Sequence, residues 1–581
     1  MSRLFFFSYM DIKTIQSFKD KRTYLPKDFK LTDWDSIKGY FNDLESSNDE
    51  LKVWLKKWSE LDAFLDEDMA WRYIKMTCDT SDENLVNAYA EFVEKIMPSL
   101  TTISNELNKL LLANPSKEEL KAISAYAVMF RGIEKEVEIF REENVALKTE
   151  EQLLEKEYGE IAGAMTVEWE GEELPLPVAF SHLERKQRDV RKSMWQSIAD
   201  RRLQDQNVLD KLFNKMVKLR QQIAVNAGYE NYRDYKFDEL GRFDYTKEDC
   251  FSFHHAIQEV VLPIVDELMT LRKQHLEVDR LRPWDLACDL FLAEPLKPFN
   301  GQEELVNKTI ACFDEIDPYF SDCIKTMKTL GHLDLESRKG KAPGGYNYPL
   351  NEIGIPFIFM NAAGTVDDVI TMVHEGGHAI HSFLTRDLAL NAFKETPSEV
   401  AELASMSMEL MSMEHWHHFF TVKEELRRAK LAQFERVITV LPWVATVDAF
   451  QHWIYEHPNH STDERTATWM DISKRFSSNI IDGSGLEKYS AKHWQKQLHI
   501  FEVPFYYVEY AMAQLGAIAM WKQYKEDPKQ GLANYKAALK LGYTKTIPEI
   551  FEAGGIKFDF SEAYIKDLMS FVKSELDQVL K

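Results

Sequence analysis

The sequence predicts a mainly α-helical fold that carries one small β-sheet. Across most of the 581 residues, apolar side chains recur at helical spacing, and only a few short segments alternate or run apolar as strands do. No Pro/Gly/Ser-rich linker, low-complexity tract or clear repeat divides the chain. Hydrophobic residues make up 45% of the chain, which is enough for a large core, so we expect one closely integrated helical body.

The N-terminal part is predicted to be helical with one β-hairpin. Between residues 51 and 65 the apolar residues fall on one face of a helix; they are Leu51, Trp54, Leu55, Trp58, Leu61 and Leu65. Residues 165–169 alternate and then meet Gly171, as one arm of a hairpin does. We place a boundary near residue 200, between an N-terminal helical subdomain (1–200) and a second domain (201–581).

Residues 355–360 are predicted to form a strand. This apolar run contains β-branched and aromatic residues and lies between Gly354 and Asn361. Pro356 near its start favours an edge strand, because proline cannot donate to a sheet ladder. An edge strand can pair with an extended peptide, so Phe357 and Phe359 are candidate substrate-binding residues.

The most informative motif is His374-Glu375-Gly376-Gly377-His378, on a predicted helix that begins with a capping box at Thr365 and Asp368. Residues four apart lie on one helix face, so both imidazoles can reach one zinc ion at about 2.0–2.1 Å. Glu375 is then placed to act on water at the metal. The glycine pair is unusual inside a helix, and close approach of a metal, a substrate or another helix would explain it.

A catalytic zinc site needs a third protein ligand. The next acidic cluster offers Glu395, Glu399 and Glu402, and spacing alone does not choose among them. Thr396 and Pro397 look like a helix start, so Glu399 could be the capping acid, whereas Glu402 could orient an imidazole. His381 is expected to lie beside the site rather than on the metal.

A second constellation follows at residues 499–510, where a histidine precedes three tyrosines: His499, Tyr506, Tyr507 and Tyr510. Imidazole and phenol groups can donate hydrogen bonds to the oxyanion that forms during peptide hydrolysis. The same residues could simply fill a core, because Tyr and Phe often do.

Together these segments resemble the thimet-oligopeptidase-like zinc metallopeptidases, and the closer match is the oligoendopeptidase F branch. The resemblance rests on the HExxH helix, the E-x-x-S element from Glu395 to Ser398, and the H-x-F-x-x-P-F-Y-Y-x-x-Y segment from His499 to Tyr510. Residues 281–285 (LRPWD), 344–346 (GGY) and 551–556 (FEAGGI) agree with it. It covers roughly residues 120 to 575.

The resemblance implies a large helical metallopeptidase body with a small sheet beside the HExxH helix and a deep substrate channel, one wall of which is the N-terminal subdomain. It implies one zinc ion per chain bound by His374, His378 and Glu395, with Glu375 as general base. It makes His499 and Tyr506 oxyanion or substrate ligands, with Tyr510 as a catalytic helper and Tyr507 as a helper that binds substrate. It also implies that the substrates are short oligopeptides. This sequence departs from the pattern of the family in two places. Gly376 stands where many family members carry a larger residue, and the interval from His374 to Glu395 is shorter than in the thimet branch.

Composition and charge narrow the alternatives. The net charge of −24 argues against nucleic acid as a partner, because phosphates require a basic surface. Residues 4–10 (LFFFSYM) are too short for a signal peptide, and no run approaches the roughly 20 apolar residues that span a bilayer. The five cysteines are scattered and include no C-x-x-C pair, which suits a reducing, cytoplasmic location and argues against thiolate metal ligands.

Two other functions remain open at this stage. One is a carboxypeptidase on the same scaffold, which would need a cationic clamp such as Arg386 for the free carboxylate of the substrate. The other is a helical binding or scaffold protein with a structural zinc site, which would have no need of Glu375. The sequence leaves the oligomeric state open.

Overall fold

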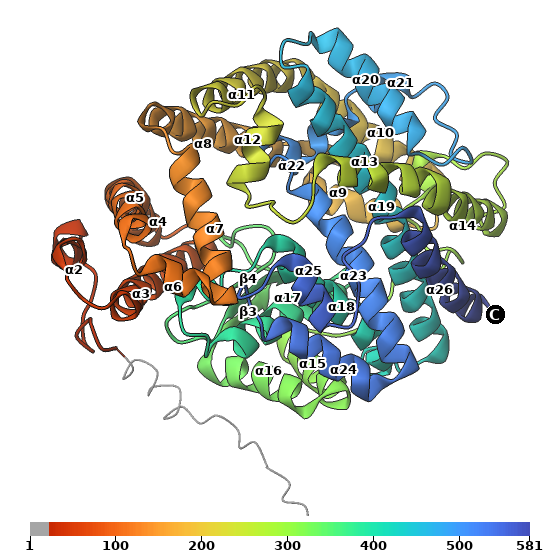
Figure 1. Ribbon diagram of the computed structural model, residues 1–581. Coiled ribbons are helices and arrows are strands. Elements are labelled where there is room, and N and C mark those ends of the chain that lie inside the picture. The colour runs from red at the N-terminus through yellow and green to blue at the C-terminus, as the bar shows by residue number, and fades with distance from the viewer. Residues whose placement is uncertain (1–21) are drawn as a thin grey trace, which may run out of the picture. The chain divides into compact units, whose positions relative to one another are not determined.

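The computed structural model describes residues 22–581, which form a mainly helical protein with two small β-sheets (Figure 1). The predicted fold class is confirmed. Residues 4–10, the apolar run that was interpreted as too short for a signal peptide, lie outside the described residues. Within the described part of the chain, none of the helices combines the length and apolar character that a bilayer crossing demands.

The chain divides into two compact units, and each unit is assembled from three stretches of sequence. Unit 1 comprises residues up to 137, 297–426 and 516–558, and unit 2 comprises residues 138–296, 427–515 and 559–581. This division differs from the single boundary predicted near residue 200. Three long helices run from one unit into the other, so no single cut separates them; they are α7 (Ser124–Ile139), α19 (Lys423–Glu456) and α23 (Tyr507–Glu526).

Unit 1 contains two groups of helices and the larger sheet. The first group is α2 (Trp34–Ser46), α3 (Leu51–Cys78), α4 (Glu83–Glu91), α5 (Met97–Ala113) and α6 (Lys117–Lys121). The second group is α15 (Gln302–Ile316), α16 (Pro318–Leu330), α17 (Val366–Thr385), α18 (Ser398–Ser412), α24 (Pro528–Leu539) and α25 (Ile547–Ala553). The strands are β3 (Leu333–Glu336), β4 (Tyr346–Tyr348) and β5 (Phe357–Ala362).

Unit 2 is helical apart from one hairpin. Its helices are α8 (Glu142–Gly163), α9 (Leu176–Ser181), α10 (Arg188–Gln204), α11 (Gln206–Asn226), α12 (Tyr232–Glu239), α13 (Lys247–Ala256), α14 (Leu262–His275), α20 (Thr462–Arg475), α21 (Glu487–Ser490), α22 (Leu498–Phe501) and α26 (Glu562–Leu580). The hairpin pairs β1 (Thr166–Trp169) with β2 (Glu172–Pro175).

The two N-terminal predictions are confirmed. All six apolar residues predicted to share a face of the first helix are buried in α3. The predicted hairpin arm is β1, and its turn holds Glu170 at φ 52° and Gly171 at φ 85°. Positive φ at both turn residues matches the right-handed twist of the flanking strands, as in a type I′ turn.

The predicted edge strand is instead the central strand of its sheet. The order is β3-β5-β4, with β5 parallel to β3 and antiparallel to β4. Pro356 lies just before the strand, so its missing N–H removes no ladder bond. Both edges of β5 are therefore paired, and the prediction that substrate pairs with this strand is wrong. The Phe359 side chain is fully buried and stacks on Tyr346 at 4.8 Å, and Phe357 is 5% exposed, so neither is an open substrate contact.

The glycine pair of the HExxH motif is explained by helix packing. A Cβ at Gly376 would lie 2.8 Å from the Phe313 ring of α15, and a Cβ at Gly377 would lie 2.6 Å from Cα of Ser405 in α18. Side chains at either position would push these helices apart. Among the explanations open in the sequence, close approach of another helix is the one observed.

We expect Gly377→Ala to destabilise the protein by about 1–3 kcal/mol, because the neighbour that must move is backbone rather than a flexible side chain. This outweighs the gain of about 1 kcal/mol that alanine brings to a helix interior. Gly39→Ala in α2 is the matched control, since nothing lies within 4 Å of its Cβ position. Thermal unfolding should show a lower midpoint for the first variant and an unchanged or higher one for the second. A stabilised Gly377→Ala would contradict this packing.

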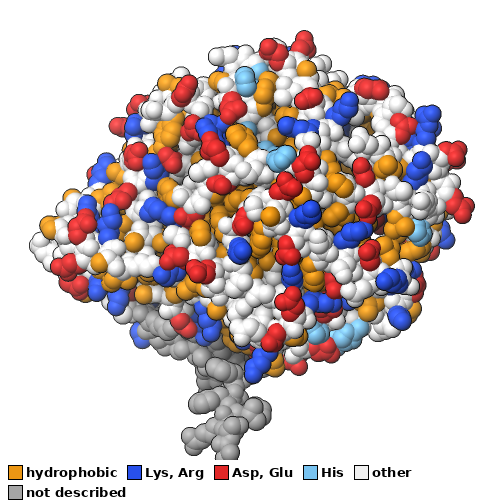
Figure 2. All heavy atoms as spheres, turned by 45° about the vertical axis from the view of Figure 1, so that its right-hand side comes forward, with side chains coloured by type: hydrophobic (Ala, Val, Ile, Leu, Met, Phe, Trp, Pro, Cys, Tyr) orange, Lys and Arg blue, Asp and Glu red, His pale blue; other side chains and the backbone are white. Residues whose placement is uncertain are grey.

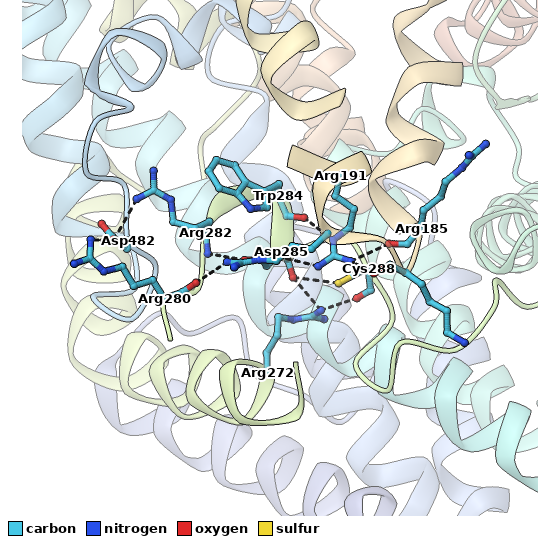
Figure 3. Close-up of polar contacts among 11 residues, drawn as sticks. Arg185, Arg191, Arg272, Arg280, Arg282, Trp284, Asp285, Cys288 and Asp482 are labelled. Atoms are coloured by element: carbon cyan, nitrogen blue, oxygen red, sulfur yellow. Dashed lines mark hydrogen bonds and ion pairs between the residues drawn. The ribbon is translucent and has the colours of Figure 1, made fainter. Parts of the chain in front are cut away.

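A buried network of arginines surrounds Asp285 in unit 2, within the LRPWD segment (Figure 3). The Asp285 carboxylate accepts hydrogen bonds from Arg188 at 2.7 Å and Arg191 at 2.9 Å, and the Arg282 backbone N–H caps it at 3.0 Å. Arg272 donates to the Cys288 carbonyl at 2.6 Å from the other side. Burial raises the pKa of Asp285, but the hydrogen bonds from the arginines lower it more, and the net pKa is below its ordinary value of 3.8. The network therefore contributes stability above pH 3.8 that is lost as the pH falls further.

Replacing Asp285 by Asn should cost about 3–5 kcal/mol, because the Arg191 side chain is 2% exposed and would keep an uncompensated charge. The matched control is Asp482→Asn, whose carboxylate pairs with Arg280 and Arg282 at 3.3 and 3.2 Å near the surface, where solvent screens the charges, so its loss of stability should be much smaller. Thermal melts at pH 7 compare the two. Equal small losses would mean that the buried pair contributes no more than the exposed one.

Candidate metal centre and active site

The HExxH helix forms as predicted. α17 starts with a capping box in which the Asp368 N–H donates to Thr365 Oγ1 at 3.2 Å and the Thr365 N–H donates to Asp368 Oδ2 at 2.8 Å. Val369 and Val373 of its apolar stripe are fully buried. The stripe fixes the rotation of the helix, so the two histidines project together, with ring centroids 4.9 Å apart.

The third member of the cluster is Glu402 of α18. Its Oε2 atom lies 3.4 Å from His374 Nε2 and 3.8 Å from His378 Nε2. Metal bonds of 2.0–2.1 Å in a tetrahedral site place neighbouring ligand atoms about 3.3–3.4 Å apart. Two imidazole nitrogens and one carboxylate oxygen at these separations fit a zinc ion with one position left for water or substrate.

The structure does not bring Glu395 to the histidines. Its Oε1 accepts a hydrogen bond from Asn391 Nδ2 at 3.2 Å, and its side chain is exposed. α18 begins only at Ser398, so Glu395 lies in the preceding loop, whereas Glu402 projects from the second turn. The structure thus places Glu402, and not the expected Glu395, beside the two histidines. The expected cap is also absent: Pro397 is the N-cap without a side-chain hydrogen bond.

Two further residues of α18 orient the ligands. Glu409 Oε1 lies 2.7 Å from His374 Nδ1, which holds that nitrogen as the N–H donor and leaves the Nε2 lone pair for a metal. Ser405 Oγ donates to Glu402 Oε2 at 3.1 Å. Glu402 and Glu409 are seven residues apart and therefore lie on one helix face. This spacing of two acids was visible in the sequence and could have identified both residues as partners of the histidines.

The electrostatics of the cluster favour a cation. Burial lowers the pKa of His374, but the hydrogen bond with Glu409 and the charges of Glu402 and Glu375 raise it to about 9 in total. Burial, countered in part by His374, raises the pKa of Glu375 to about 7. Burial and the neighbouring His374 push the pKa of His378 well below its ordinary value, so this ring is neutral and able to coordinate. The raised pKa of His374 reflects the carboxylates of Glu409, Glu402 and Glu375 around it, whose negative charge a divalent ion would also balance.

Glu375 lies between the two histidines in the sequence and is only 7% exposed. Asn347 Nδ2 of β4 donates a hydrogen bond to its backbone carbonyl at 3.3 Å. His381 is buried and lies outside the metal cluster, as expected. Burial lowers its pKa to about 4, so it is a neutral packing residue.

The second predicted constellation assembles within unit 2. His499 contacts Tyr506, Tyr507 and Tyr510 with ring centroids 6.0, 4.7 and 5.8 Å away. These four side chains therefore share one patch, as the sequence analysis expected.

A chain of hydrogen bonds sets the tautomer of His499. Trp443 Nε1 can only donate, and it donates to Gln497 Oε1 at 3.0 Å. The Gln497 amide nitrogen must then donate to His499 Nδ1, 2.7 Å away. Burial lowers the pKa of His499 to about 4, so the ring is neutral near pH 7. Its one proton therefore lies on Nε2, which makes His499 a hydrogen-bond donor.

Backbone strain at Phe505 positions Tyr506. Phe505 is fully buried with φ 66°, a conformation that L-residues rarely adopt. Its N–H donates to Gln451 Oε1 at 2.6 Å, and Arg242 donates to its carbonyl while pairing with Glu509 at 2.6 Å. Gln451 and Arg242 were not predictable from the sequence, because they come from elements far from Phe505 in the chain, whereas Glu509 lies only four residues after it.

Comparison with known proteins identifies the family. The sequence model of peptidase family M3 matches residues 181–570, well over half of the chain. The chain belongs to peptidase family M3. The model of the M3 N-terminal domain matches residues 28–140 of this M3 peptidase.

Curated relatives of the M3 peptidase carry the predicted branch name. This chain is 22% identical over 415 residues to oligoendopeptidase F, chromosomal, of Lactococcus lactis subsp. cremoris. The match covers 69% of this chain and 65% of that protein. The chain is 22% identical over 420 residues to oligopeptidase PepF of Bacillus subtilis (strain 168), covering 69% of this chain and 58% of that protein. The matches thus span less than two thirds of the length of these relatives.

Solved structures share the fold of the M3 peptidase over nearly its whole length. Pz peptidase A with an inhibitor is 25% identical, with a TM-score of 0.87 over 96% of this chain and 99% of that chain. A structure that carries the name oligoendopeptidase F, from Bacillus anthracis str. Ames, is 23% identical with a TM-score of 0.83 over 96% and 99%. The resemblance to the oligoendopeptidase F branch is confirmed.

Proposed function

We propose that this M3 peptidase is a zinc-dependent endopeptidase that hydrolyses short oligopeptides, with Glu375 as general base. The observation that carries the proposal is the cluster of His374, His378 and Glu402 at zinc-like separations, with Glu375 on the same helix between the two histidines. The names of the curated relatives support oligopeptides as the substrate class.

His374, His378 and Glu402 would hold the zinc ion, with Glu409 keeping His374 in the coordinating tautomer. When bound, zinc supplies a Lewis acid that polarises the scissile carbonyl and acidifies water. A Glu375 carboxylate oxygen accepts a proton from the attacking water and passes it to the nitrogen of the leaving amine. A carboxyl group whose surroundings already raise its pKa toward neutrality is suited to both steps.

His499 and Tyr506 are proposed to donate hydrogen bonds to the oxyanion. A neutral imidazole with its proton on Nε2, and a phenol held in place by the strained Phe505, provide two directed donors. Tyr510 contacts both rings and is proposed to assist. Tyr507 also contacts His499 and hydrogen-bonds the Trp443 and Gln497 side chains, so we assign it to positioning His499 rather than to contacting substrate.

The alternatives have less support. A carboxypeptidase clamp at Arg386 would require a guanidinium directed at substrate, whereas Arg386 follows the end of α17 and pairs with Asp387 at 3.7 Å. A scaffold protein would have no use for Glu375 beside an open metal position.

On the face shown in Figure 2, acidic and basic side chains are interspersed, so the net charge of −24 does not gather there into a surface for one charged partner.

The proposal is tested with a library of 6- to 20-residue peptides, whose products are identified by mass spectrometry with and without a zinc chelator. Internal cuts that the chelator abolishes and added zinc restores are expected. Cuts confined to the C-terminus, and lost when the peptides are amidated, would instead establish a carboxypeptidase. Absence of cleavage by the zinc-loaded protein would overturn the proposal.

Gln497→Leu should lower kcat about tenfold or more with a smaller change in KM, because His499 loses the donor that fixes its tautomer, and residues that orient a catalytic group commonly contribute 10–100-fold. Steady-state kinetics on a cleaved peptide measure this. In a His499→Gln background the same substitution should have no further effect on kcat. A full additional loss there would show that Gln497 acts independently of His499.

A further inference from the structure

A second group of metal-ligating side chains, distinct from His374, His378 and Glu402, lies inside unit 2. Cys250 and His254 are one turn apart on α13, and Asp448 and His452 are one turn apart on α19. Each pair has the i, i+4 spacing that places both side chains on one helix face. Two such faces directed at each other bring four potential ligands together from segments almost two hundred residues apart.

Three of these side chains have the geometry of a metal site. The Cys250 Sγ, an Asp448 carboxylate oxygen and a His452 ring nitrogen all lie within 4.8 Å of one another. His452 Nε2 is 3.4 Å from Asp448 Oδ2, the same separation as between His374 and Glu402 in the proposed active site. Zinc bonds of about 2.0–2.3 Å to nitrogen, oxygen and sulfur require ligand separations of about 3.3–3.6 Å in a tetrahedral site. Small side-chain rotations close the remaining difference.

The protein alone does not satisfy this cluster. Cys250 and Asp448 are fully buried and His452 is 2% exposed. Asp448 Oδ1 and both ring nitrogens of His452 have no hydrogen-bond partner among the described residues. A buried carboxylate without full compensation costs several kcal/mol, and buried polar atoms are normally paired. One cation bound by the Asp448 carboxylate and one ring nitrogen of His452 would offset part of this cost.

The surroundings support a metal ion at this place. His254 Nε2 lies 2.8 Å from Asp448 Oδ2 and orients the carboxylate, as the outer partners of metal ligands do. The rings of Phe251 and Phe505 flank His452 at 4.9 and 5.3 Å, which keeps the local environment apolar. His254 and His452 also line a cavity of about 660 Å³.

We propose that Cys250, Asp448 and His452 bind a second zinc ion, which links α13 to α19. A thiolate, a carboxylate and a neutral imidazole carry two negative charges, which balance one divalent cation. The thiol releases its proton to solvent on binding, so binding strengthens as the pH rises. A ligand set of sulfur, nitrogen and oxygen suits zinc, whereas calcium and magnesium prefer oxygen alone. The chain would then hold two zinc ions rather than the one expected from its sequence.

Cobalt substitution tests the proposal without relying on activity. A thiolate bound to Co²⁺ gives an intense charge-transfer band in the near ultraviolet, and the proposed active site contains no cysteine. We expect this band when the full-length protein is loaded with Co²⁺, and its retention in a His374→Ala/His378→Ala variant. Cys250→Ser, which keeps the size but not the thiolate, should abolish it. The matched control Cys312→Ala alters another fully buried cysteine and should leave the band unchanged.

Metal content provides the second measurement. After zinc loading and desalting, the protein should hold about two zinc ions per chain, and Cys250→Ser or Asp448→Asn about one. The exposed group of Glu315, His417 and His418 could also take up metal, so all proteins are compared in a His417→Ala/His418→Ala background. Two results would contradict the proposal. One is the absence of the thiolate band in the cobalt-loaded, unsubstituted protein, and the other is a zinc content that neither substitution changes. Either result would show that Asp448 and its histidines form only a hydrogen-bonded network.

Discussion

Glu402→Gln is expected to lower zinc affinity by at least about 100-fold, because loss of residues that merely orient ligands already costs 10–100-fold. An amide oxygen carries no charge and binds zinc far more weakly than a carboxylate. Gln has the same shape and can still accept the hydrogen bond from Ser405 Oγ, so α18 should keep its packing against α17. Competition with a chromophoric chelator measures the affinity, and peptidase activity at fixed free zinc should fall in parallel.

The matched control is Glu395→Gln, the acid that the family resemblance favoured. Glu395 is exposed and bonds Asn391 rather than the histidines, so its replacement should leave zinc affinity and activity within about twofold of the unaltered protein. Glu409→Gln should give an intermediate loss, since it weakens the hold on His374 without removing a ligand. If Glu395→Gln loses zinc and Glu402→Gln keeps it, the assignment of ligands must be reversed.

The contrast between these two acids shows what the sequence could and could not predict. The HExxH helix and its cap were predictable because capping and i, i+4 spacing are local properties of the chain. The third ligand depends on where a second helix starts and on which turn faces α17, which are properties of packing. Glu402 and Glu395 were equally acceptable chemically, and only the fold separates them.

The same dependence on packing explains why the central position of β5 and the division into two units were not predicted from the sequence. Pro356 correctly marks a strand boundary, but whether a strand is central depends on partners that come from elsewhere, here β3 and β4. The division into units follows long helices that pass between them, which no composition shift marks. Cys250 and Asp448 are nearly two hundred residues apart in the sequence, so their meeting was beyond any motif search, and the scattered cysteines pointed away from thiolate ligands.

The residues that position His499 in unit 2 were also only partly predictable from the sequence. Gln497 is two residues from His499 and could have been suspected as a local partner, whereas Trp443 fixes the direction of its amide from a different helix. A sequence indicates which groups can donate or accept, and the fold decides which of them do. The tautomer of His499, on which its proposed role depends, is therefore a tertiary property.

Glu375→Gln should reduce kcat by about 10²–10⁴-fold, the range that general acid–base groups typically contribute, while zinc content stays unchanged. The amide cannot take a proton from water, yet it has the same size, and Glu375 is buried at only 7% exposure, so packing is preserved. Because the loss comes from the chemical step, KM should change much less than kcat. Glu375→Asp keeps the carboxylate but withdraws it by one methylene, and should recover part of the rate. This pair separates a loss of proton transfer from a loss of metal: zinc-loaded Glu375→Gln with activity near that of the unaltered protein would remove Glu375 from the mechanism, whereas inactivity accompanied by zinc loss would assign it to holding the site together.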